Sequence, residues 1–167
     1  MLAAECAWTV LRAEHARMRE LLSLLERELK SGDLKRPGSA AVRIVRLIER
    51  LQDFDEATHR PKGVALLGVL RGRSAEADDL LARLERQHER CDDLLSQAKA
   101  KLERVQSGDA PAATAVENLL AEHRRLLLDH LDKEDTLLHS HTALLLTREE
   151  WAAVVSSISK AMRARRA

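Results

Sequence analysis

An apolar helical stripe in the second half of the chain contains side chains of the kind that bind metal ions. Leucine and valine recur at steps of three or four residues from Val116 to His141, and His123, His130 and Glu134 stand in the same stripe. Burying imidazoles and a carboxylate without partners is costly, so something must satisfy them. His130 and Glu134 are four residues apart, and one helical turn places both side chains beside one point. The spacing predicts a metal site on the inner face of a helix.

Three earlier segments each carry a histidine in an apolar stripe: His15, His59 and His88. If neighbouring helices run antiparallel, the turns between them fix the depth of each histidine, at ~1.5 Å per residue. By this measure His59, His88 and His130 share a layer to within about one helical turn. His15 lies about 6 Å from the level of His59, an offset that loop geometry and the exact helix ends can absorb. We therefore expect His15, His59, His88, His130 and Glu134 to form one metal site.

The remaining histidines are expected to lie outside this layer. His123 is separated from His130 by about 10 Å along the helix axis. His141 lies farther away in the opposite direction, and His139 does not share the inner stripe. We interpret these three as histidines of the core or of the bundle end.

Helices must position these residues, because the chain is rich in Leu, Ala, Arg and Glu and has only six Gly and three Pro. Short connections between long amphipathic segments predict an all-α, up-down-up-down four-helix bundle, with a short fifth helix across one end. The bundle is expected over residues 3–143, and the C-terminal helix over residues 148–162. The first three predicted long helices cover about residues 3–30, 40–71 and 75–106. The fourth has Pro111 near its first turn and runs to about residue 143.

Local signals mark the ends and one interruption of these helices. Ser39 and Ser74 are expected N-caps, and the pair at Thr147–Glu150 predicts a capping box for the fifth helix. Pro61 falls inside the second helix and cannot donate a backbone hydrogen bond. Since the apolar periodicity continues on both sides, we predict a kinked helix bent beside His59.

Composition limits the classes of function. The 167 residues suit one domain, residues 1–167, and the formal net charge of +1 gives no electrostatic case for nucleic acid or a membrane surface as partner. No apolar run approaches the ~18 residues of a membrane span, and no signal peptide is visible. Two cysteines without a framework fit a reducing compartment. We expect a cytoplasmic protein.

The same residues resemble the pattern of the hemerythrin-like (HHE cation-binding) family over about residues 10–145. The resemblance rests on Glu14-His15, the segment His59-Arg60-Pro61-Lys62-Gly63, His88, and His130 followed four residues later by Glu134. It implies a non-haem di-iron centre that is bridged by carboxylates and capped by imidazoles. Such centres bind dioxygen, sense oxygen or redox state, or handle iron and nitric oxide.

The chain departs from the family pattern beside His59. The second histidine of the family's HHPKE segment is Arg60 here, and its glutamate is Gly63. Two iron ions close together need bridging anions to offset their repulsion, and with Gly63 only Glu134 remains of the motif carboxylates. The glycine is expected to open a cavity for water, an anion or a small ligand.

Other side chains near the site are candidate ligands. Asp92 lies four residues after His88 and offers a replacement carboxylate, although such pairs are equally common on charged surfaces; Asp55 is a weaker candidate. Cys91 lies one turn from His88 and would suit zinc, but cysteine is often buried for packing alone. Four imidazoles and one carboxylate favour iron, as one or two ions, over zinc, copper or manganese.

Three hypotheses for function follow. The leading one is a hemerythrin-like iron-binding protein that interacts with dioxygen, nitric oxide or redox signals. Gly63 leaves open a metal-free bundle that acts as an interaction module through its C-terminal helix and Trp151. A third is an iron-dependent peroxidase or oxidase, for which an open coordination position is necessary but not sufficient.

Overall fold

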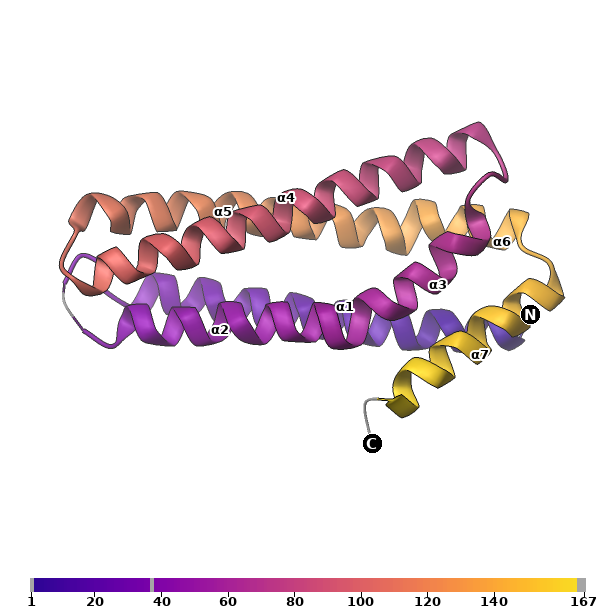
Figure 1. Cartoon of the computed structure of the whole chain (residues 1–167), viewed down its shortest axis with the longest axis horizontal. Helices are drawn as coiled ribbons and strands as arrows, with labels where there is room; N and C mark the ends of the chain where they lie inside the picture. The colour runs from indigo at the N-terminus through magenta and orange to yellow at the C-terminus, as the bar shows by residue number, and fades with distance from the viewer. Residues whose placement is uncertain (1, 37, 165–167) are drawn as a thin grey trace.

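The computed structural model describes residues 2–36 and 38–164, and all regular structure in these ranges is helical. Four long rods form a bundle and a shorter helix follows them (Figure 1). The elements are α1 (Leu2–Ser31), α2 (Ala40–Phe54), η1 (Asp55–His59), α3 (Arg60–Leu70), α4 (Ala75–Gln106), α5 (Ala110–Lys133), η2 (Glu134–Leu138), α6 (His139–Leu145) and α7 (Arg148–Ala164). The predicted four-helix bundle with a C-terminal fifth helix is confirmed.

Two of the rods contain a π-helical turn. The second rod runs through α2, η1 and α3, and it bends where α3 begins (Figure 1). The kink predicted near His59 is therefore present, as a π-turn directly ahead of Pro61. The fourth rod runs through α5, η2 and α6, and its π-turn begins at Glu134 without a proline nearby. π-turns are rare and concentrate at functional sites, and both lie at the predicted histidine layer.

Apolar packing lies above and below this layer. One core cluster includes Met18, Leu51 and Cys91 and fills the bundle on the side of the α4–α5 turn. A second includes Leu11 and Leu84 and fills the opposite end. In each rod the layer histidine falls between residues of the two clusters, so a band of buried polar groups crosses an otherwise apolar interior.

The fifth helix, α7, completes the second cluster. Trp151 is 1% exposed and packs with apolar residues of α1 and α3, so α7 covers the end of the bundle at which α1 begins (Figure 1). The predicted capping box is confirmed, because the Thr147 N–H donates to Glu150 Oε2 at 2.8 Å and the Glu150 N–H donates to Thr147 Oγ1 at 3.3 Å. No helix within the described ranges combines the length and hydropathy of a membrane span.

The two serine caps differ. The Ala77 N–H donates to Oγ of Ser74 at 3.1 Å, which confirms Ser74 as the N-cap of α4. Ser39 occupies the N-cap position of α2, as predicted, but its side chain does not cap the helix. Its backbone is already in the helical region and its hydroxyl accepts from the Arg43 guanidinium, so the side chain satisfies no backbone N–H.

Candidate metal centre

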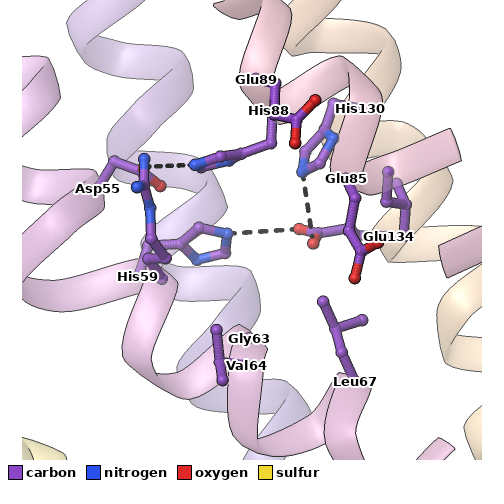
Figure 2. Close-up of a pocket in the computed structure, with 12 residues that line it drawn as sticks. Asp55, His59, Gly63, Val64, Leu67, Glu85, His88, Glu89, His130 and Glu134 are labelled. Carbon is purple, nitrogen blue, oxygen red and sulfur yellow. Dashed lines mark hydrogen bonds and ion pairs between the residues drawn. The ribbon is translucent and has the colours of Figure 1, made fainter. Parts of the chain in front are cut away.

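Glu134 is the residue on which the imidazoles of the layer converge. Its Oε2 lies 3.0 Å from Nε2 of His15 and 3.4 Å from Nε2 of His59, and its Oε1 lies 3.5 Å from Nε2 of His130. Figure 2 shows His59 and His130 reaching this carboxylate from different elements. All four residues are buried. The structure thus brings together four of the five residues predicted as ligands.

Each of these side chains is directed inward by its helical position. His15 lies in α1 between buried Leu11 and Met18, one turn away on either side. His130 and Glu134 are four residues apart along the fourth rod, as the sequence pattern requires. The two π-turns place His59 at the last residue of η1 and Glu134 at the first residue of η2.

The ring of His15 is held by a charged pair on its outer side. Nδ1 of His15 lies 2.7 Å from Oδ1 of Asp135, and Oδ2 of Asp135 accepts from the Arg19 guanidinium at 2.9 Å. A histidine that donates Nδ1–H to a carboxylate keeps the lone pair of Nε2 for a ligand on its inner side. Asp135 therefore orients Nε2 of His15 toward Glu134.

The ring of His59 has a similar but fully buried support. Its Nδ1 lies 3.5 Å from Oε2 of Glu14, and Glu14 pairs with the ammonium of Lys62. Lys62 is only 3% exposed and also donates to the carbonyl oxygen of Thr58 at 2.6 Å. A lysine is almost never this buried unless it is paired, so we count the Glu14–Lys62 ion pair as part of the centre.

His88, the fifth predicted ligand, faces a different set of groups. Its Nε2 lies 3.5 Å from Oδ2 of Asp55 and 3.6 Å from Oδ2 of Asp92, and Figure 2 shows it directed toward Asp55. Its ring centroid lies 6.2 Å from that of His130. Arg60 also binds both carboxylates. His88 therefore belongs to a second group beside the one around Glu134.

His15, His59, His130 and Glu134 form the first group, and the negative charge of Glu134 is balanced by the imidazoles around it. Burial raises the pKa of Glu134, but contact with His130, His15 and His59 outweighs it and holds that pKa well below its ordinary value. Burial lowers the pKa of His59, yet Glu134 and Glu14 outweigh it and raise the pKa to about 10. A cation bound here would replace the proton of His59 against the same carboxylate.

The donor atoms fit a metal ion. Atoms of His15, His59 and Glu134 all lie within 4.8 Å of one another, as do those of Asp55, His88 and Asp92. Nε2 of His15 and Oε2 of Glu134 are buried and lie 3.0 Å apart, but within the described part of the chain neither atom has a partner at hydrogen-bond geometry. Buried polar atoms without hydrogen bonds are rare and call for an explanation. Imidazole and carboxylate donors are suited to iron, zinc or manganese.

A cavity opens from this centre toward α3. It measures about 220 Å³, and Gly63, Val64 and Leu67 line one side while His88, His130 and Glu134 line the other (Figure 2). Apart from its chain neighbours and the backbone of its own helix, a Cβ atom added at Gly63 would meet no heavy atom within 4 Å. The predicted cavity at this glycine is confirmed, and it is large enough for a small molecule or several waters.

The other candidate residues lie outside both groups. His123 is 1% exposed, and burial lowers its pKa to about 4, partly offset by Asp92. The ring of His139 packs on Trp8 at a centroid distance of 4.9 Å. Cys91 is buried, and burial, Asp92 and Asp55 raise its thiol pKa to about 12, so it is not a ready thiolate ligand.

Sequence reasoning missed the charged groups around the imidazoles. Asp135, Lys62 and Arg19 had no assigned part, and Glu14 entered only as the neighbour of His15. One signal was present, because Lys62 lies four residues after Thr58 on the inner side of a helix, at a position that an apolar residue would normally take. Such a lysine needs a buried acid to pair with.

Comparison with known proteins agrees with these residues. The family profile described as "Hemerythrin HHE cation binding domain" matches residues 6–141, a range that contains both groups. No curated protein and no solved structure matches the chain.

Proposed function

The chain belongs to the hemerythrin HHE cation-binding family, and on this premise we propose that it binds iron between His15, His59, His130 and Glu134, with His88 at the open edge of the site. The bound iron would supply reversible redox change and binding of dioxygen or nitric oxide. In this proposal the protein senses these molecules or redox state, or handles iron.

One observation carries the proposal: both oxygens of Glu134 face imidazole nitrogens, from three different rods of the bundle. This carboxylate would ligate the cation and offset part of its charge, while the imidazoles complete the set. Nδ1 of His15 contacts Asp135 at 2.7 Å, and Nδ1 of His59 lies 3.5 Å from Glu14. In the metal-bound form each ring would keep its proton on this outer nitrogen and offer the lone pair of its inner nitrogen to the ion.

The surroundings suit a small apolar gas. Leu11, Met18, Leu51, Leu84 and Leu127 are buried next to the layer and limit access of water. The cavity at Gly63 reaches His130 and Glu134, and apolar Val64 and Leu67 form part of its wall. A diatomic molecule can enter this space without displacing a side chain.

Metal analysis tests the proposal. The purified chain is incubated with Fe(II) without oxygen, desalted and analysed for transition metals, beside His130→Ala, Glu134→Ala and the control His141→Ala. We expect iron in the parent and the control, and at least a tenfold loss of affinity in the other two. If the parent retains no transition metal, and chelators leave its thermal stability unchanged, the metal-free bundle is the correct alternative.

The open cavity also favours a second function, an iron-dependent peroxidase or oxidase, because it leaves room for a substrate at the ion. This function predicts turnover of hydrogen peroxide with an organic reductant by the iron-loaded protein, and loss of turnover in His130→Ala. Iron binding without turnover would leave the binding function alone.

A further inference from the structure

Arg60 places a permanent positive charge inside the second group. Its Nη2 lies 2.8 Å from Oδ2 of Asp55 and 3.0 Å from Oδ2 of Asp92. The same two oxygens lie 3.5 Å and 3.6 Å from Nε2 of His88. The guanidinium therefore binds the two carboxylates that a metal ion at His88 would need. Because an arginine side chain does not lose its proton in proteins, this charge cannot be removed by deprotonation.

The carboxylates that contact the outer nitrogens of His15 and His59 are also paired with cationic side chains. Glu14 pairs with Lys62, and Asp135 pairs with Arg19. Among the described residues, Glu134 has ion-pair contacts with histidines but none with lysine or arginine. Imidazole nitrogens are themselves metal ligands, whereas the lysine ammonium and the arginine guanidinium are not. The negative charge of Glu134 is therefore available to a bound cation.

We propose that the guanidinium of Arg60 takes the place of a second metal ion, so that this chain binds a single ion, at Glu134. The inference rests on the proposed function and specifies the number of ions. An ion at His88 would lose two carboxylate ligands to Arg60 and would face the repulsion of the guanidinium. Gly63 adds no anion on that side to offset this repulsion. Glu85 and Glu89 also line the cavity, but both are exposed and, among the described residues, neither makes an ion pair with His88.

Counting ions tests the inference. The protein is titrated with Co(II) and with anaerobic Fe(II), and the bound metal is measured by calorimetry and by elemental analysis after desalting. We expect one ion per chain in the parent, one in Arg60→Lys, which keeps the charge, and two in Arg60→Gln. The control Arg90→Gln removes an exposed arginine that pairs with Glu122 and should also bind one.

Two further variants identify the second ion. Adding Asp92→Asn to Arg60→Gln should return the count to one, because it removes a carboxylate of the second group. Asp92→Asn alone should change the metal affinity by less than threefold relative to the parent. This measurement tests the inference even if Arg60→Gln does not fold. Circular dichroism checks the fold of each variant.

The failures of the two proposals are distinguishable. Two ions in the parent, one ion in a folded Arg60→Gln, or a tenfold loss of affinity in Asp92→Asn would overturn this inference and leave the proposed function intact. No ion in the parent would overturn both.

Discussion

His15 and Glu134 lie in the first and the fourth rods of the bundle, and Nε2 of His15 is 3.0 Å from Oε2 of Glu134. His59 meets the same oxygen from the second rod, at 3.4 Å. An ion coordinated by these side chains would join segments from both ends of the sequence. Metal binding at this point should therefore stabilise the whole bundle.

The first prediction is that iron raises the thermal midpoint of unfolding. A ligand that binds only the folded state adds about 2.7 kcal/mol at a free concentration of 100 times its Kd. Fe(II) without oxygen should raise the midpoint measured by circular dichroism, and EDTA should reverse the rise. Glu134→Gln should show no rise, whereas His141→Gln should behave as the parent. An equal rise in Glu134→Gln would mean that the ion binds elsewhere.

The second prediction concerns the support of His15. Asp135→Asn weakens the acceptor that orients the ring, and loss of such a partner typically lowers metal affinity about 10- to 100-fold. Asp132 provides the matched control, because it pairs with the same Arg19 at 2.9 Å but makes no contact with His15. Calorimetric titration should show weaker binding in Asp135→Asn alone. Equal losses in the two variants would show that Arg19, and not the histidine contact, sets the affinity.

The third prediction concerns the buried pair of Glu14 and Lys62. Lys62→Met leaves the carboxylate of Glu14 buried without its cation, and breaking such a pair costs about 3–5 kcal/mol. The double variant Glu14→Gln/Lys62→Met removes both charges and should recover part of the loss. Urea unfolding of the metal-free proteins measures the free energies. A double variant no more stable than Lys62→Met would show that the two charges are not coupled.

The fold could be predicted from the sequence because helical periodicity and turn residues report directly on backbone structure. The apolar stripes of the four rods, the cap at Ser74 and the box at Thr147–Glu150 all follow from local rules. The meeting of His15, His59 and His130 with Glu134 also follows, because antiparallel rods with short turns fix the depth of each residue.

The remaining features depend on side-chain direction and on contacts between distant segments. No proline or glycine marks the π-turn at Glu134. The direction of His88 is tied to Arg60, which joins Asp55 and Asp92 from two different rods. Sequence spacing does not report such a bridge. Its existence requires a known distance between helices, which only the folded structure supplies.

The fourth prediction is a pH dependence caused by His123. Burial lowers the pKa of this residue to about 4 in the folded chain, against 6.5 for the ordinary group. Between pH 6.5 and 4 His123 therefore binds a proton in the unfolded chain but stays neutral in the folded chain. Stability should fall as the pH is lowered from 6.5 to 4, by up to about 3 kcal/mol from this group. The measurement is urea unfolding of the metal-free protein at several pH values.

The variant His123→Gln isolates this contribution. Other groups titrate equally in the parent and the variant, so the difference between their curves of stability against pH belongs to His123. The variant should lose less stability than the parent between pH 6.5 and 4. Parallel curves would mean that folding does not lower the pKa of His123.

The fifth prediction concerns Gly63, which affects both the stability of α3 and the space in the cavity at Glu134. Apart from chain neighbours and the backbone of the helix itself, nothing lies within 4 Å of a Cβ atom added at Gly63 or at Gly68, and both glycines lie inside α3. Alanine at either position should therefore stabilise the protein by up to about 1 kcal/mol, because glycine is the poorer helix former. Gly63 alone lines the cavity at Glu134, so its side chain decides what space is left there.

Leucine substitutions then test the cavity itself. Gly63→Leu should fill much of the about 220 Å³ beside Glu134 and lower the affinity of the iron-loaded protein for nitric oxide at least tenfold, whereas Gly68→Leu should leave it unchanged. Nitric oxide binding is measured by optical titration, and the iron content of each variant is determined first, so that loss of metal is not mistaken for loss of the ligand. Equal affinities in the two leucine variants would show that the ligand reaches the ion by another path.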